Sequence, residues 1–293
     1  MPRNQPLLTF MVALVVLAQT AGCRPRAPAF VELEQARRAA ADLRVHLNKA
    51  ADASNRAVMA DTDEASIAFA REAEALSKEV TGDIAALASA LQRLGFPDEI
   101  RLLSEFEKHF AKYLELDKSI LELAVENTNL KAQRLSFGAS REAADGFRAA
   151  LESMLGNAAA KDRCRIEVLI DRAALAVRGI QVLHAPHIAE TEAAKMTDLE
   201  REISGLTATA IDAVEGLTKL GGAKHAEAVV VARRYFDRFK EISDQIVSLS
   251  RRNSNVRSFD LALRARPPLT AACDNTVQAL QEALANEGSK ATR

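Results

Sequence analysis

The chain has 293 residues, with 39 Lys and Arg against 40 Asp and Glu, 48% apolar residues, 4% aromatic residues and no Trp. These values exclude an intrinsically disordered chain, a collagen and a disulfide scaffold. The net charge of −1 leaves no surplus of Lys and Arg to displace counterions from phosphates, so we expect no nucleic-acid partner. Only 12 Gly and 8 Pro are present, which is typical of long helices.

The first residues have the pattern of an export signal, which we place at 1–22. Arg3 precedes an apolar stretch from Leu7 to Ala18, which is shorter than the about 20 residues that cross a bilayer. The following Thr20-Ala21-Gly22-Cys23 resembles the lipobox of bacterial lipoproteins, in which the Cys thiol is diacylated and becomes the new N-terminus. The resemblance implies that Cys23 is lipidated; ordinary cleavage and an uncleaved anchor are the alternatives, since Thr20 stands where that family prefers Leu.

A tether at 23–29 is expected next, and helix breakers are rare beyond it. Because Pro is seldom tolerated inside a helix, the long runs between Pro97, Pro186 and Pro267 can each hold extended helices. Eight helical stretches follow from the breakers and the apolar period. They are 30–60, 62–94, 97–136 and 139–156 in the first half, and 160–184, 187–220, 223–265 and 269–286 in the second.

The two halves repeat one pattern. Phe110, Ile120 and Asn127 recur as Phe236, Ile246 and Asn253, and the breakers fall in register as well. Short connections force neighbouring helices to be antiparallel. The sequence therefore predicts an all-α fold with two tandem up-down-up-down four-helix bundles, copy 1 at 30–157 and copy 2 at 158–287, and a tail at 288–293. It leaves open whether the last helix of copy 1 continues into copy 2.

The segment NTNLKAQRLSFGASREAADGFRAALESML from Asn127 to Leu155 resembles the periplasmic four-helix-bundle sensor domain of methyl-accepting chemotaxis receptors. The positions that carry the resemblance are Asn127, Ala132, Leu135, Gly138, Ala143, Phe147, Ala150 and Leu151. The resemblance implies a sensor bundle that recognises a small solute. Such receptors also have a second membrane span, a HAMP linker and a cytoplasmic coiled coil, which we do not find in the sequence. Carrying a signal across the membrane would then need a separate transmembrane signalling protein.

In each copy, one asparagine lies on the apolar seam of the third helix. Asn127 continues the spacing of Ile120 and Leu123, and Asn253 occupies the matched position. A buried amide on a seam sets the register of the helices at some cost in stability. The alternative is that both amides line a polar pocket for a small solute. Asn129 and Asn255 lie about 200° further round the helix, so we expect them to face outward or toward a partner.

The sequence contains no pattern of catalytic residues. We find no glycine-flanked Ser, no Cys near a His and no phosphate-binding glycine loop, and we expect neither an enzyme nor a cofactor. His184 and His187 with Glu190 have the spacing of metal ligands, but Pro186 lies between them at an expected helix end, so no metal site is predicted. Cys164 and Cys273 are expected to be two buried, free thiols.

These observations indicate a lipid-anchored, sensor-like bundle in the bacterial cell envelope that recognises a small solute or a partner protein. Arg24 after Cys23 favours the outer membrane over the inner, by resemblance to enterobacterial lipoprotein sorting. The competing hypothesis is a structural envelope rod or tether without a small-molecule ligand. A membrane contact through the lipid, a transmembrane signalling partner and a homodimer are the candidate assemblies.

Overall fold

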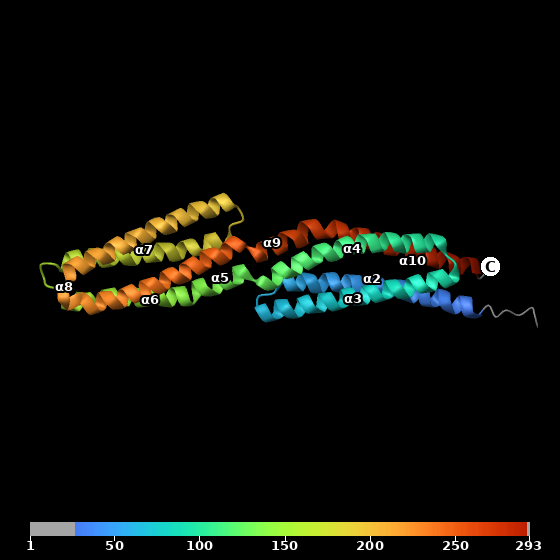
Figure 1. Cartoon of the computed structure of the whole chain (residues 1–293), viewed down its shortest axis with the longest axis horizontal. Coiled ribbons are helices and arrows are strands. Elements are labelled where there is room, and N and C mark those ends of the chain that lie inside the picture. The colour runs from blue at the N-terminus through green and yellow to red at the C-terminus, as the bar shows by residue number, and fades with distance from the viewer. Residues whose placement is uncertain (1–26, 292–293) are drawn as a thin grey trace, which may run out of the picture. The chain divides into compact units, whose positions relative to one another are not determined.

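The computed structural model describes residues 27–291, which form helices and no strand (Figure 1). The predicted all-α fold class is therefore confirmed. The expected signal at 1–22 and the lipidation site Cys23 lie outside the described residues. Among the described residues, the first helix begins at Ala27, inside the expected tether, and the last one continues to Ala291, inside the expected tail. None of the described helices combines the length and the apolar character of a membrane span.

The helices follow one another with short connections. They are α2 (Ala27–Met59), α3 (Asp63–Leu94), α4 (Pro97–Glu126), α5 (Thr128–Phe137), α6 (Ala139–Glu152), the 3₁₀ helix η1 (Ser153–Asn157), α7 (Arg163–Ala189), α8 (Ala193–Arg252), α9 (Ser254–Asp260), the π-helix η2 (Leu261–Ala265) and α10 (Arg266–Ala291).

Local sequence explains where the first of these helices begin and end. Asp63 and Glu64 place negative charge in the first turn of α3, where it compensates the helix dipole. Gly95 adopts a φ of 71° after α3, a left-handed conformation that glycine tolerates best. Pro97 then occupies the first position of α4, where its missing N–H costs no helical hydrogen bond.

The helix α8 turns back on itself. A straight helix of 60 residues would be about 90 Å long, yet Arg251 near its end donates to the carbonyl oxygen of Ala193 at its start, at 3.1 Å. Arg233 also lies within 3.3 Å of the hydroxyl of Thr218. The chain therefore reverses between Thr218 and Arg233, in the region where Gly221 and Gly222 predict the end of one helix and the start of the next.

The described chain divides into two compact units. Unit 1 contains the residues up to Lys49, Ala75–Ala111 and the residues from Leu269 onward, and unit 2 contains Ala50–Glu74 and Lys112–Pro268. Buried residues of α2 and α10 in unit 1 follow the alternating three- and four-residue spacing of a helical seam. They are Leu33, Ala36, Ala40, Leu43 and Leu47 on α2, and Cys273, Val277, Leu280 and Leu284 on α10.

The expected bundles at 30–157 and 158–287 are not these units. In unit 1, α10 from the second repeat packs on α2 from the first, where Arg37 donates to the carbonyl oxygen of Leu284 at 3.2 Å and Arg44 pairs with Asp274 at 2.7 Å. In unit 2, Phe147 and Phe236 lie with ring centroids 5.4 Å apart. Because both repeats carry the same seam, the pattern fits either repeat as a partner, and the grouping predicted from it was wrong.

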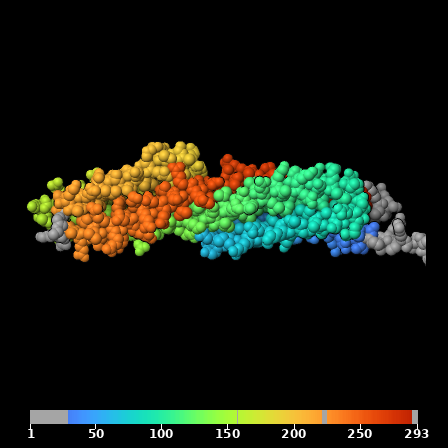
Figure 2. Space-filling model, in the orientation of Figure 1, coloured from blue at the N-terminus to red at the C-terminus, as the bar shows by residue number. Residues whose placement is uncertain are grey.

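The core of unit 2 lies between α5, α6, α7 and both halves of α8. Its largest buried side chains include Phe147, Leu151, Ile166, Phe239 and Ile246. In the space-filling view, the yellow and orange atoms of α8 cover much of the visible face of this unit (Figure 2). The polar contacts described below lie within unit 2.

Candidate binding site

The two seam asparagines interrupt their helices. Asn127 separates α4 from α5 with φ 49° and ψ 39°, and Asn253 separates α8 from α9 with φ 53° and ψ 37°. They are the only described residues other than glycine with a positive φ. Asn is, after Gly, the residue that tolerates this left-handed conformation best, because its short side chain bonds locally. The matched positions of the two repeats thus share one unusual backbone conformation.

The two breaks face each other and cap each other's helices. The backbone N–H of Thr128 donates to the hydroxyl of Ser254 at 3.1 Å, and the N–H of Ser254 donates to the hydroxyl of Thr128 at 3.0 Å. The two hydroxyl groups are themselves 3.1 Å apart. Each helix start therefore obtains from the other repeat the oxygen acceptor that an N-cap residue normally supplies from within the same segment.

The residues that follow, Asn129 and Asn255, make the same reciprocal bonds with their amide side chains. The N–H of Asn129 donates to the Oδ1 of Asn255 at 3.1 Å, and the N–H of Asn255 donates to the Oδ1 of Asn129 at 3.2 Å. The Nδ2 of Asn129 then donates to the Oδ1 of Asn253 at 2.7 Å, and that of Asn255 to the Oδ1 of Asn127 at 2.8 Å. We call these six residues, 127–129 and 253–255, the paired helix break.

Asn129 and Asn255 were expected to face outward or toward a partner, and the structure corrects this: each faces the other repeat of the same chain. Asn129 is buried and Asn255 is half-buried, and both point into the paired helix break. The left-handed residue before each of them changes the phase of the helix, so counting 100° per residue across the break does not apply.

The two seam amides are not equivalent. The Nδ2 of Asn253 donates to the carbonyl oxygen of Glu190 at 3.0 Å, whereas the buried Nδ2 of Asn127 has no acceptor among the described residues. An unmade bond at a buried amide costs about 1–3 kcal/mol. The bonds to Asn129 and Asn255 across the break support the interpretation that these amides set how the helices pair.

A charged pair precedes the two breaks. Glu126 accepts from the Nε of Arg252 at 2.6 Å, and a second guanidinium nitrogen completes a bidentate pair. The Arg252 guanidinium holds the pKa of the Glu126 carboxyl below its ordinary value. These two residues also occupy matched positions of the repeats, so the pairing of the helices extends one residue before each asparagine.

A cavity of about 340 Å³ lies beside the paired helix break. This volume is near the lower limit for small-molecule sites. The polar groups of its wall are uncharged, while the rest is apolar. The lining residues are Val58, Ala60, Asn129, Leu130, Gln133, Ser136, Phe137, Ala185, Ile188, Ala189 and Asn255. This chemistry suits a small, uncharged or weakly polar solute better than an ion.

The two histidines of the HAPH sequence are buried on α7. The helix continues through Pro186 to Ala189, so the helix end predicted at 184 was wrong by five residues. The ring of His184 lies 2.9 Å from the hydroxyl of Ser243 and packs against Phe239. Burial, with a smaller contribution from His187, lowers the pKa of His184 from 6.5 to about 4. His184 is therefore neutral near pH 7.

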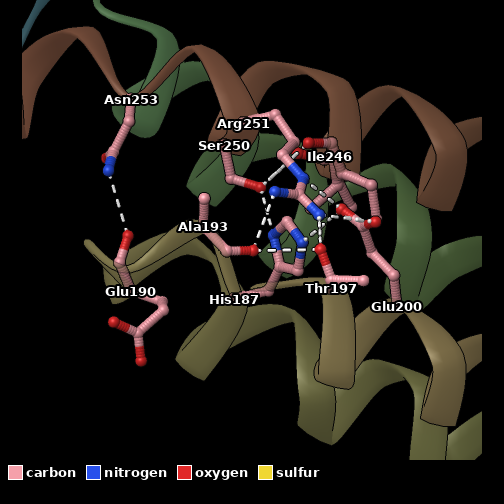
Figure 3. Close-up of polar contacts among 10 residues, drawn as sticks. His187, Glu190, Ala193, Thr197, Glu200, Ile246, Ser250, Arg251 and Asn253 are labelled. Atoms are coloured by element: carbon pink, nitrogen blue, oxygen red, sulfur yellow. Dashed lines mark hydrogen bonds and ion pairs between the residues drawn. The ribbon is translucent and has the colours of Figure 1, made fainter. Parts of the chain in front are cut away.

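His187 belongs to a second buried network (Figure 3). Its Nδ1 lies 2.5 Å from the hydroxyl of Ser250, and its Nε2 lies 3.0 Å from the carboxylate of Glu200. Arg251 holds that carboxylate with two bonds of 2.6 and 2.8 Å and lowers the pKa of Glu200. The hydroxyl of Ser250 also donates to the carbonyl oxygen of Ile246 at 2.9 Å. Ser250 and His187 have no exposed surface, so this serine, histidine and glutamate join α7 to α8 and offer no accessible nucleophile.

A third buried polar cluster was not predicted from the sequence. Asp117 on α4 accepts from Ser54 at 2.6 Å and from Arg266 at 3.1 Å. Burial raises the pKa of Asp117, while Ser54 and Arg266 oppose that rise. The π-helix η2 ends immediately before Arg266. No sequence pattern distinguishes Asp117 and Arg266 from the charges on exposed helix faces. Their burial, at 3% and 4% exposure, shows that they form an internal pair.

The remaining candidate ligands are dispersed. In the described part of the chain, no group of three or more His, Cys, Asp and Glu has the arrangement of a metal site. Cys273 is buried as predicted, and burial raises the pKa of its thiol to about 12. Cys164 is exposed, which corrects the expectation that both thiols are buried, because it lies at the first turn of α7 outside the core.

Comparisons with known proteins assign no function to this site. No protein-family model, curated protein or solved structure matches the chain.

Proposed function

We propose that this chain is a sensor-like helical-bundle protein that recognises a small solute in unit 2 and is held at the bacterial envelope by a lipid on Cys23. The observation that carries the proposal is the cavity beside the paired helix break. Solute sites in helical bundles are formed between facing helices by a few polar groups in an apolar wall. The amides of Asn129 and Asn255 and the hydroxyl of Ser136 meet that description.

The paired helix break supports a mechanism for the response. A solute in the cavity contacts residues of α5, α7 and α9 at the same time, since Gln133, Ala189 and Asn255 all line it. Asn129 belongs both to this wall and to the capping bonds between the repeats. Binding can therefore favour one angle of the break over another, to the extent that the solute's affinity differs between the two conformations. A transmembrane signalling protein would receive that change.

A variant that fills the cavity tests the solute proposal. Ala189 is exposed and lines this cavity, so Ala189→Trp should occupy the space at little cost in stability. We expect some member of a panel of small polar solutes to raise the melting temperature of the parent chain, and Ala189→Trp to abolish that increase. Ala194→Trp, at an exposed position of α8 outside the cavity wall, is the matched control and should keep it. If no solute raises the melting temperature of the parent, the solute proposal is wrong.

The lipid anchor needs a separate test because Cys23 lies outside the described residues. We expect the chain to incorporate a radiolabelled fatty acid in bacterial cells, and Cys23→Ser to lose both the label and the membrane fraction. Retention of the label by Cys23→Ser would contradict lipidation at this residue.

The competing function is a structural rod or tether without a small-molecule ligand. Its support is that most amide groups of the paired helix break already bond within the protein, as the contacts of Asn129 with Asn253 and Asn255 illustrate. A chain that no solute stabilises but that retains an envelope protein in a pull-down, unaffected by Ala189→Trp, would favour this function.

A further inference from the structure

The helix α7 has two apolar faces. One face contributes Ile166, Ile170, Val177 and other buried residues to the core of unit 2. On the other face, Val168, Leu175 and Val182 are 59%, 70% and 62% exposed. Single exposed apolar residues are ordinary, but three of them at seven-residue spacing form the seam of a helix that packs against another helix.

A groove runs along this exposed face. It has a volume of about 900 Å³ and lies between α6 and α7, with Leu175 and Val182 on α7 and Phe147 on α6 among its lining residues. Phe137, at the end of α5, also lines this groove and is 68% exposed. Together, the exposed seam and the open groove have the shape of a site that accepts one further helix.

The charges of the groove are balanced. The lining residues include three arginines, Arg141, Arg148 and Arg178, and three acidic residues, Asp145, Glu152 and Asp171. Along α6 the signs alternate, with ion pairs of 3.8 Å between Arg141 and Asp145 and between Arg148 and Glu152. A strongly acidic or basic partner, or an anionic membrane surface, would meet as much repulsion as attraction here. A partner with the same alternating charges fits best.

The exposed face of α7 is nearly symmetric about Leu175. Val168 and Val182 lie seven residues before and after Leu175, and Asp171 and Arg178 lie four before and three after it. When two such helices pack antiparallel around a two-fold axis at Leu175, each Val168 meets the other Val182. Each Asp171 then lies one residue, about 1.5 Å along the helix axis, from the position directly opposite the other Arg178. A two-fold interface requires this kind of self-complementary patch.

We propose that the α7 face of unit 2 docks a second copy of this chain, antiparallel and with the two-fold axis at Leu175. The α7 seam of each copy lies in the groove between α6 and α7 of the other. The apolar part of this face consists of three side chains, Val168, Leu175 and Val182, which is little apolar area for a permanent interface. The dimer is therefore expected to be weak and reversible, with a Kd of about 1–10 µM.

Cysteine cross-linking in the full chain tests the position of the axis. In a Cys164→Ser background, Leu175→Cys should form a disulfide-linked dimer rapidly under mild oxidation, because each Leu175 lies opposite its own copy. Val168→Cys and Val182→Cys should cross-link to each other in a mixture faster than either does alone. Val230→Cys, at a position of α8 that is 57% exposed, is the matched control and should remain monomeric. Equal cross-linking at 175 and 230, or none at 175, overturns the proposal.

A charge exchange tests the pairing of Asp171 with Arg178. Asp171→Arg and Arg178→Asp should each weaken the dimer about tenfold in sedimentation experiments on the detergent-solubilised full chain, because two ion pairs become two repulsive contacts. The double variant restores the opposite charges and should recover the parent affinity. Both positions lie on the solvent side of α7, so the fold is expected to persist, with far-UV circular dichroism as the check.

Three outcomes contradict the proposal. A parent chain that is monomeric at about 100 µM has no such dimer. Single and double charge variants of equal affinity exclude this antiparallel register. A different protein, or the chain's own Leu7–Ala18 segment, protecting Leu175→Cys from labelling while the chain stays monomeric would assign the groove to that occupant.

Discussion

The mutual capping of the two helix breaks predicts a specific loss of stability in Ser254→Ala. This change removes the acceptor of the buried Thr128 N–H and the contact between the two hydroxyls. An unsatisfied buried N–H costs about 1–3 kcal/mol, and the lost hydroxyl contact costs about 1 kcal/mol more. We therefore expect unfolding free energy to fall by about 2–4 kcal/mol. Urea unfolding, monitored by far-UV circular dichroism, measures this loss: the urea concentration at the midpoint decreases, while the dependence of the unfolding free energy on urea concentration stays the same.

A double-mutant cycle separates the capping bonds from the shared contact. Thr128→Ala should cost a similar amount, since it removes the acceptor of the Ser254 N–H. The double variant loses the hydroxyl contact once and not twice, so its cost should be about 1 kcal/mol less than the sum of the single costs. Ser258→Ala is the matched control, because this buried serine donates only to the carbonyl oxygen of Asn255 at 2.9 Å. A loss in Ser254→Ala no greater than in Ser258→Ala would refute mutual capping.

Three further changes test other parts of unit 2 and the thiols. Asn253→Ala should be about 1 kcal/mol less stable than Asn253→Gly in urea unfolding, since both lose the same amide bonds but only alanine is strained at a φ of 53°; equal stabilities would contradict a strained break. The pKa of His184 falls from 6.5 to about 4 on folding, so the unfolded chain binds the extra proton and stability is lost as pH decreases from about 6.5 to 4, by roughly 3 kcal/mol. His184→Gln should remove that part of the pH dependence, and an unchanged pH profile would show that His184 is not responsible. A thiol reagent at pH 8 should modify the exposed Cys164 rapidly but Cys273 only after unfolding, and mass spectrometry of the two peptides would reveal the opposite order if the buried position of Cys273 is wrong.

Much of the local structure could be predicted because it depends on near neighbours in the sequence. The glycine and proline at 95–97 end one helix and begin the next, as expected from their backbone preferences. The proline at 186 predicts the end of α7 at 184, but the helix continues to Ala189, and His187 beyond the proline is held by Ser250 and Glu200. Contacts of that kind join residues far apart in the chain, and no local pattern encodes them.

The candidate site was predicted in part. Asn127 and Asn253 were recognised as special because an amide interrupts an apolar seam at matched positions. Their left-handed backbone and their bonds to Asn129 and Asn255 were not foreseen. Predicting which way a side chain points from about 100° per residue assumes a continuous helix. The left-handed residues Asn127 and Asn253 interrupt the helices, so the prediction fails for Asn129 and Asn255.

The sequence by itself determined the helical class, most helix ends and the recurrence of one pattern after 126 residues. In the structure, the same recurrence appears as the bond between the matched residues Thr128 and Ser254. Only the tertiary structure decided which helices pack together. Identical seams fit one another equally well, so choosing between partners within a repeat and across repeats depends on particular contacts, such as Arg44 with Asp274 and Asp117 with Arg266. Those contacts exist only after distant parts of the chain have been brought together, and a periodic pattern carries no information about them.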